Sequence, residues 1–312
     1  MKKPPLPSYQ EYKAAFLAKG VHFPLQKITA PKDGLLTMLP SNGNRQGWPW
    51  NEEVKSEEYN EKIAWPKISV ISPSYNQGAY FEETIRSVLL QNYPNLEYIV
   101  IDGGSNDNTV SILNQYAQWI SYWQSEKDRG QSHAINLGFS IASGQIYCWI
   151  NSDDYFTKGT LKEVALAYVL KKAQFIYGNC YNLKDGVFSP FRVAITFDRY
   201  LCIPGLSQPS TFWAAEIHQP IWEELSCTLD FELWMRIAKG ARKKYLDIYL
   251  SVAREHSESK THTQDEKLRQ RWREDQDRQW SVHGPVPWHR LNNERRYVQK
   301  LFRMFPLLKK LF

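Results

Sequence analysis

Short apolar segments alternate with amphipathic segments from Lys67 to Tyr177, and this alternation constrains the fold more than any other feature of the sequence. Segment 67–73 is short, apolar and rich in β-branched residues, as buried strands are. Apolar residues in 80–91 recur close to the 3.6-residue period of a helix. The same patterns predict strands at 96–101, 119–124, 146–150 and 175–177, and helices at 108–116, 131–143 and 161–172. Strands and helices that alternate over short connections predict an α/β fold with a mostly parallel sheet flanked by helices.

Polar clusters follow three of these strands where each strand ends: Ser74-Tyr75-Asn76, Asp102-Gly103-Gly104-Ser105 and Ser152-Asp153-Asp154. In open α/β sheets, ligands bind beyond the carboxyl ends of the strands. The tyrosine offers an aromatic face to a nucleobase, although a lone tyrosine more often packs in a core. The paired glycines allow a ligand to approach the backbone closely, although a plain turn uses them in the same way.

The adjacent carboxylates of Asp153 and Asp154 repel each other unless a cation or hydrogen-bond donors neutralise them. Hard divalent ions such as Mg²⁺ and Mn²⁺ bind one or two carboxylates together with substrate phosphates. The alternative is an exposed turn whose aspartate caps the next helix. The pair therefore indicates a metal site only in combination with other features.

The composition is that of a globular protein. The chain has 312 residues with 12 Trp, 18 Tyr and 14 Phe, an aromatic content that excludes disorder as the main state. No run approaches the roughly 18 apolar residues of a membrane span, and no apolar segment follows the charged start, so a secretory signal is not expected. The four cysteines stand far apart, which favours a reducing cytoplasm over a zinc site or disulfide framework: Cys148, Cys180, Cys202 and Cys227.

Both ends of the chain read as additions to the central domain. Residues 1–66 carry scattered proline, glycine and tryptophan with a short helix near 9–19, and predict a strap over the main domain or, alternatively, a lid or acceptor-side element. An exposed helix is predicted near 260–278, and Gly284-Pro285-Val286-Pro287 ends it. A helix from Asn293 places Val298, Leu301, Phe302 and Phe305 on one face.

The net charge of +6 belongs to the C-terminal segment. Residues 285–312 hold seven Lys and Arg against one acid, Glu294, so the rest of the chain is neutral. This distribution argues against a nucleic-acid-binding face. A basic amphipathic helix can lie on an anionic membrane surface or dock on the catalytic domain, and the sequence leaves both possibilities open.

In combination, these motifs resemble the family 2 glycosyltransferases over about residues 67–258. The resemblance rests on six segments taken together: Lys67 to Thr109, Glu126 to Gly130 with Ala134, Asn136 and Gly138, Asn151 to Asp154, Gln208 to Phe212, Asp230 to Arg236, and Arg254 to His256. It implies a GT-A fold between an N-terminal extension (1–66) and a helical, basic C-terminal segment (259–312). It also implies transfer of a sugar from a nucleotide-diphosphate donor with Mn²⁺ or Mg²⁺.

The resemblance assigns nucleotide contacts to Pro73, Tyr75 and Asp102, with a further contact at Asp128. Many relatives carry a second acid directly after the first, where this chain has Gly103, and this departure puts the mode of base recognition in doubt.

The resemblance also implies that Asp154 is the direct metal ligand, that Asp153 lies near the ribose and the metal, and that His256 faces the metal or the diphosphate. A divalent ion there would neutralise the charge that develops on the leaving diphosphate. The alternative for the histidine is a surface position.

Asp230 falls where the family has its catalytic base, which deprotonates the acceptor hydroxyl in an inverting transfer. The alternative is a charge that favours the N-terminus of the next helix. Glu232, two residues on, is the rival base. Trp213, Trp222 and Trp234 lie in the same half of the chain, and their spacing suits core packing at least as well as sugar binding.

The expected function is an inverting, metal-dependent hexosyl- or N-acetylhexosaminyltransferase, most simply with a UDP-sugar donor. Its acceptor would be a saccharide or a lipid-linked saccharide in polysaccharide or glycoconjugate synthesis, at a cytoplasmic location or the inner face of the membrane. A non-catalytic nucleotide-sugar-binding or scaffolding protein is the alternative, and Gly103 favours it. A nucleotidyltransferase would need a basic, glycine-rich loop after the first strand, and Pro73 to Gly78 contains no Lys or Arg.

Overall fold

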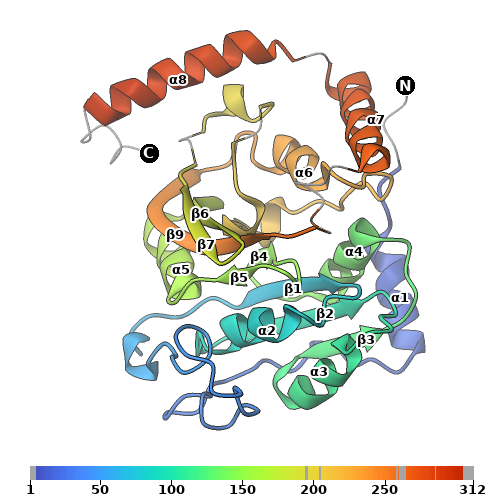
Figure 1. The fold of residues 1–312 in the computed structure, drawn as a ribbon, viewed down its shortest axis with the longest axis vertical. Coiled ribbons are helices and arrows are strands. Elements are labelled where there is room, and N and C mark those ends of the chain that lie inside the picture. Colours follow the sequence, from blue (N-terminus) through green and yellow to red (C-terminus); the bar gives the residue numbers. More distant parts are fainter. Residues whose placement is uncertain are drawn as a thin grey trace.

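The computed structural model describes residues 5–193, 196–203, 205–257, 259, 265–284 and 286–304. In this part of the chain nine strands form one sheet, in the order β3-β2-β1-β4-β8-β6-β9-β5, with β7 paired to β6. Figure 1 shows helices on both sides of this sheet and the two C-terminal helices at one end of the molecule. The predicted α/β fold with flanking helices is confirmed.

The N-terminal half of the sheet is parallel and carries the predicted elements in the predicted order. Its strands are β1 (Ile68–Ser74), β2 (Leu96–Asp102), β3 (Tyr122–Ser125) and β4 (Ile146–Trp149), and its helices are α2 (Phe81–Leu89), α3 (Thr109–Tyr116) and α4 (Gln131–Ile141). β1, β2 and β4 are buried along their whole length, and most of their residues are apolar. Successive β2 residues enter opposite clusters, with Val100 against α2 and α3 and Ile101 against α4. Helices therefore cover both faces.

The second half of the sheet is mixed. It contains β5 (Tyr155–Phe156), β6 (Phe175–Lys184), β7 (Val187–Phe191), β8 (Thr211–Ala214) and β9 (Lys243–Glu255), with α5 (Thr160–Lys171) and α6 (Leu229–Ile237). β6 and β9 are parallel, whereas β8 runs antiparallel to β4 and β6. β6 is much longer than the predicted strand at 175–177 because it also pairs with β7 in a hairpin. The sequence patterns did not predict β5, β7 or β8.

The N-terminal extension packs into the core of the domain. α1 (Tyr9–Ala18) contacts α4, and Leu35, Leu39 and Val54 belong to the main apolar cluster. The buried guanidinium of Arg86 on α2 donates hydrogen bonds to the backbone carbonyls of Pro40, Pro49 and Trp50. This arrangement is the strap that the sequence predicted as one of two alternatives.

Two helices follow the sheet: α7 (Glu266–His283) and α8 (Trp288–Met304). α7 ends at Gly284, whose φ of +83° is unfavourable for residues with a side chain. α8 begins five residues before the predicted start at Asn293, and Phe305, the last apolar position of the predicted stripe, lies outside the described residues.

α8 docks on the central domain. Leu291 packs with Tyr200 and Ile203, and the Phe302 ring lies 6.4 Å from that of Phe197. Its opposite face leaves three large apolar side chains exposed, Tyr297, Leu301 and Met304. One face of α8 therefore packs against the rest of the protein, which is one of the two alternatives that the sequence left open for this segment. No helix among the described residues is long and apolar enough to cross a membrane.

Candidate active site

The carboxyl ends of β1, β2 and β3 meet in register, with Ser74 opposite Asp102 and Asp102 opposite Ser125. The Asp102 carboxylate is buried and accepts hydrogen bonds from the backbone N–H groups of Gly104 and Ser105 and from the hydroxyls of Ser105 and Ser125. The carboxylate oxygens thus accept their hydrogen bonds from groups of the protein itself. Asp102 therefore shapes the turn after β2, and its contact with a nucleotide stays a prediction.

Asp128, in the loop after β3, lies over Gly103. A Cβ atom on Gly103 would lie 3.1 Å from Asp128 Oδ2, tighter than most real contacts. Burial raises the pKa of Asp128, and the charge of Asp102 acts in the same direction. A carboxylate side chain at position 103 would thus overlap the side chain of Asp128, which comes from the loop after β3.

The two other residues expected to contact the nucleotide differ in exposure. Tyr75 is 60% exposed at the end of β1, so its ring face is open to a ligand. Pro73 is buried within β1. Nearby, the Ser74 hydroxyl is buried and has no hydrogen-bond partner among the described residues. Of this group, only Tyr75 presents a side chain openly.

Asp153, Asp154 and His256 come together after β4 and β9. His256 Nε2 lies 3.0 Å from Asp153 Oδ2, and the Tyr80 ring lies 4.7 Å from the imidazole ring. The Asp154 carboxylate is buried and accepts hydrogen bonds from the backbone N–H of Arg254 at 2.9 Å and from the Asn151 amide at 3.3 Å. Burial raises the pKa of Asp154, and the charge of Asp153 adds to this effect. The more accessible carboxylate is therefore Asp153, whose side chain is 21% exposed.

A hydrogen-bond network joins this acidic segment to the Gln208–Phe212 motif. The Asn151 amide group lies 2.8 Å from Gln131 and 3.3 Å from Gln208, whose own amide nitrogen donates to the Trp149 carbonyl. Two segments that carry the family resemblance, Asn151 to Asp154 and Gln208 to Phe212, thus lie together at the end of β4.

Asp230 lies in the first turn of α6. Within the described chain no hydrogen bond joins its carboxylate to Asp153 or Asp154. Burial raises the pKa of Asp230 to about 6, opposed by the backbone N–H of Phe231. A carboxylate with a pKa near 6 is ionised at neutral pH yet basic enough to accept a proton during a reaction.

Glu232, the rival base, is fully buried and already paired. Its carboxylate accepts two hydrogen bonds of 2.7 Å from Arg236, four residues on, and lies 3.1 Å from His283 Nε2 on α7. A carboxylate held in this way is not free to accept a proton from a substrate.

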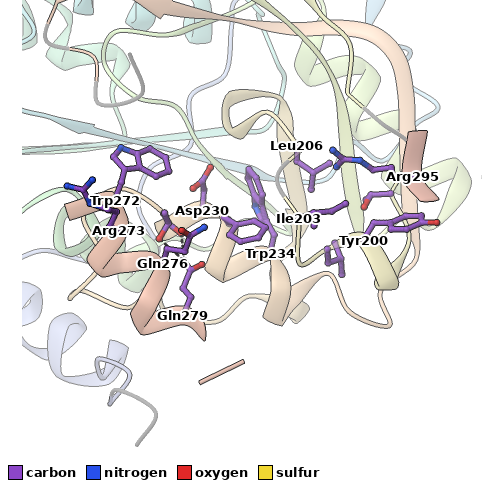
Figure 2. Close-up of a pocket in the computed structure, with 15 residues that line it drawn as sticks. Tyr200, Ile203, Leu206, Asp230, Trp234, Trp272, Arg273, Gln276, Gln279 and Arg295 are labelled. Atoms are coloured by element: carbon purple, nitrogen blue, oxygen red, sulfur yellow. Dashed lines mark hydrogen bonds between the residues drawn. The ribbon is translucent and has the colours of Figure 1, made fainter. Parts of the chain in front are cut away.

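Asp230 lines a cavity of about 220 Å³ between α6, residues of the segments 196–203 and 205–206, and the two C-terminal helices (Figure 2). The α6 wall consists of Asp230, Phe231 and Trp234. The other walls consist of Thr196, Tyr200, Leu201, Ile203, Gly205, Leu206, Thr228, Trp272, Arg273, Gln276, Gln279 and Arg295. Sequence reasoning missed the α7 residues Trp272 and Gln276, although a tryptophan in such a charged segment was a signal for an inward face.

The central part of the chain, residues 69–213, matches the family model described as "Glycosyl transferase family 2". Glycosyltransferase GlyG of Streptococcus pneumoniae is 32% identical over 126 residues, which are 39% of this chain and 42% of that protein. An uncharacterized glycosyltransferase of Rickettsia felis is 31% identical over 215 residues, covering 63% of this chain and 35% of the relative. The alignments thus cover less than half the length of these relatives.

Two solved structures have a similar fold. TarS 1–349 of Staphylococcus aureus, solved in complex with UDP-GlcNAc, has a TM-score of 0.54 at 21% identity and covers 69% of this chain and 73% of that one. Mannosyltransferase PcManGT of Pyrobaculum calidifontis, in complex with GDP-Man and Mn²⁺, has a TM-score of 0.53 at 18% identity and covers 73% and 68%. Residues 69–213 of the chain match the model of glycosyltransferase family 2, and the described residues have the GT-A-like α/β fold of these neighbours.

Proposed function

We propose that the protein is an inverting, metal-dependent glycosyltransferase that moves a sugar from a nucleotide-diphosphate donor to a saccharide or lipid-linked acceptor. The observation that carries this proposal is Asp230, a carboxyl group with a raised pKa at the wall of a cavity. Asp230 lies beyond the residues that match the family model, so its role depends on this geometry and on the resemblance of the surrounding motif.

The donor side of the site is the edge formed by the ends of β1 to β4. The exposed ring of Tyr75 is suited to stacking on a base, and Asp128, which lies over Gly103, would accept hydrogen bonds from that base. We propose a UDP-sugar with a hexosyl or N-acetylhexosaminyl group. Support for a nucleotide-diphosphate donor comes from the neighbours, one solved with UDP-GlcNAc and one with GDP-Man.

Asp153 and His256 are the side chains that would hold Mn²⁺ or Mg²⁺, with Asp154 behind them. Among the described residues no group of three or more His, Cys, Asp or Glu is placed to hold a metal ion. A carboxylate suits these ions and an imidazole is a less typical ligand for them, so substrate phosphates would supply the further oxygen ligands. Such an ion, when bound, neutralises the negative charge of the leaving diphosphate.

In the proposed reaction, the residue of this chain that takes part directly is Asp230, which accepts one proton. As the acceptor oxygen forms its bond to the anomeric carbon, Asp230 takes the hydroxyl proton. The bond from that carbon to the diphosphate oxygen breaks at the opposite face, and its electron pair leaves with the nucleotide. One displacement of this kind inverts the configuration at the anomeric carbon.

A cytoplasmic location is part of the proposal. All four cysteines are free thiols in the structure, which suits a reducing compartment. The exposed apolar face of α8 is the surface that would contact the inner face of a membrane if the acceptor is lipid-linked.

Thermal unfolding with UDP, GDP, CMP and dTDP, each with and without Mn²⁺, tests the donor side. A ligand that binds only the folded state raises the unfolding temperature. We expect strong stabilisation by one diphosphate, UDP, and only with Mn²⁺. Stabilisation by none of the four would contradict the proposal and favour a non-catalytic protein.

A further inference from the structure

The loop after β3, residues 126–130, is contacted by the N-terminal helix α1, which lies outside the part of the chain that matches the family model. Lys19, directly after α1, forms an ion pair with Glu126 in this loop. The same loop carries Asp128, the acid that lies over Gly103 on the donor side of the site. Figure 1 shows α1 beside α4, the helix that follows the loop. The N-terminal extension thus reaches the donor side.

Tyr12 on α1 joins this loop to a third part of the chain. Its hydroxyl donates a hydrogen bond of 2.6 Å to Glu223 Oε1 and accepts one of 2.7 Å from the Arg129 guanidinium. Arg129 also donates to Glu223 Oε2 at 2.6 Å. Burial and the hydrogen bond to Glu223 raise the pKa of Tyr12 to about 12, so the hydroxyl keeps its proton at neutral pH. These three side chains, the Tyr12 cluster, therefore close one ring of hydrogen bonds.

The Tyr12 cluster is anchored at Glu223. The amide nitrogen of Asn136 on α4 donates to Glu223 Oε1 at 3.2 Å and to the Ile221 carbonyl, and the amide oxygen accepts from the Ile221 backbone N–H and from the Tyr9 hydroxyl. The Glu223 side chain is 18% exposed, whereas that of Arg129 is 60% exposed. Holding an exposed arginine in one position costs side-chain entropy. The carboxylate is thus the fixed point of the cluster, and the position of the arginine depends on its two partners.

The backbone around Arg129 sets the position of Asp128, its neighbour in the chain. The Arg129 backbone N–H donates to His133 Nδ1 at 3.2 Å, and the Gly130 backbone N–H donates to Asp128 Oδ1 at 2.7 Å. The Tyr12 ring meets the His133 ring edge-on, with 5.6 Å between the ring centres. Tyr12 therefore contacts both the side chain of Arg129 and the histidine that holds its backbone, so it acts on the loop at two points.

We propose that α1 is a positioning element of the donor site, and that Tyr12, through Arg129, fixes loop 126–130 in the conformation that presents Asp128 to the base of the nucleotide. Tyr12 is a positioning residue, because it acts through the loop and not on the nucleotide itself. A loop that is already ordered does not have to be ordered when the donor binds, which increases the affinity. The contact between Asp128 and a base rests on the proposed function, whereas the fixing of the loop by α1 does not.

The test is hydrogen–deuterium exchange of the full chain without ligand, followed in peptides that cover residues 126–130. Tyr12→Phe keeps the ring against His133 and removes only the hydroxyl. We expect the loop amides of this variant to exchange about threefold to tenfold faster than in the wild type, because one hydrogen bond less opposes local opening. The variant is also expected to bind UDP with Mn²⁺ about threefold to tenfold more weakly. Stabilisation by Mn²⁺ with pyrophosphate, which has no base, is expected to stay at the wild-type level.

The N-terminal extension offers a matched control. Tyr59 is buried, and its hydroxyl donates a hydrogen bond of 2.5 Å to the carbonyl of Gln91, which is not part of the Tyr12 cluster or of loop 126–130. We expect Tyr59→Phe to lower the overall stability but to leave the exchange of the loop and the affinity for UDP as in the wild type. Glu223→Gln is a second test, expected to act like Tyr12→Phe. The double variant is expected to lose less than the sum of both single losses, because the two side chains belong to one cluster.

Unchanged exchange of loop 126–130 in Tyr12→Phe would overturn the proposal. It would show that contacts within the domain hold the loop, such as the hydrogen bond from the Glu126 backbone N–H to the Asp102 carbonyl. An equal effect of Tyr59→Phe, or an equal loss of pyrophosphate and UDP binding, would also overturn it, because either result indicates a general loss of structure. Failure of the proposed function is seen separately, as a wild type that binds no nucleotide, and the exchange of the free protein then still decides whether α1 fixes the loop.

Discussion

Replacing Asp230 by Asn is expected to make the protein more stable at neutral and alkaline pH and unable to transfer sugar. Burial raises the pKa of Asp230 from 3.8 to about 6, so the folded protein binds its proton more tightly than the unfolded chain does. Ionising this carboxyl in the folded state therefore costs about 3 kcal/mol more than in the unfolded state, at about 1.4 kcal/mol per pKa unit. Asparagine has a similar shape and carries no charge, so it avoids this cost.

The sign and the pH dependence follow from linkage. An acid with a raised pKa in the folded state contributes its full stability below the unfolded-state pKa and loses it as the pH rises through the folded-state pKa. The advantage of Asp230→Asn should be close to zero below pH 4, about half its maximum at pH 5, and about 3 kcal/mol at pH 8. For 312 residues, 1 kcal/mol corresponds to about 1.5 °C, so the variant should melt about 4.5 °C higher at pH 8.

The assay is thermal unfolding of both proteins between pH 4 and pH 8, without nucleotide. In parallel, transfer by the wild type should fall about tenfold per pH unit below pH 6, where the base becomes protonated. A variant that is equally or less stable at pH 8, or an advantage that does not grow with pH, would refute the argument that Asp230 is held ionised at an energetic cost.

Three further changes test other parts of the site. Asp153→Asn is expected to remove the additional stabilisation that Mn²⁺ gives in the presence of UDP, and an unchanged increment would show that this carboxylate does not face the ion. Gly103→Asp should weaken UDP binding in thermal unfolding, because its side chain meets the carboxylate of Asp128, and stronger binding would refute that reason. Asp275→Ala leaves three backbone N–H groups without their acceptor and should lower the free energy of unfolding by about 3 kcal/mol in urea titrations; a loss under about 1 kcal/mol would contradict rigid docking of α7.

The parallel half of the fold could be predicted from the sequence because its signals are local. β1, β2 and β4 are short, mostly apolar segments followed by polar clusters, and each helix between them carries its own periodicity. The antiparallel strands carry no such signal. β7 is exposed along its whole length and β5 has two residues, so each depends on pairing with a partner distant in sequence or on a hairpin turn.

In the candidate site too, local features could be predicted from the sequence, whereas contacts between distant residues could not. Asp153 and His256 are 103 residues apart and could be linked only through the family resemblance, and the structure places them in contact. The sequence does not show that the Asp102 carboxylate is used up by local donors, because this depends on how the turn after β2 folds. The contribution of Trp272 to the cavity is likewise a long-range contact, which helical periodicity within α7 alone does not reveal.

The most direct test of the central claim is donor turnover by the wild type and Asp230→Asn, followed as release of nucleotide diphosphate from UDP-GlcNAc, UDP-glucose and GDP-mannose with Mn²⁺. The account predicts that the wild type turns over one of these donors, that Asp230→Asn is slower by at least about a hundredfold, and that UDP with Mn²⁺ stabilises both proteins equally. Turnover by Asp230→Asn at the wild-type rate would contradict the assignment of Asp230 as the base.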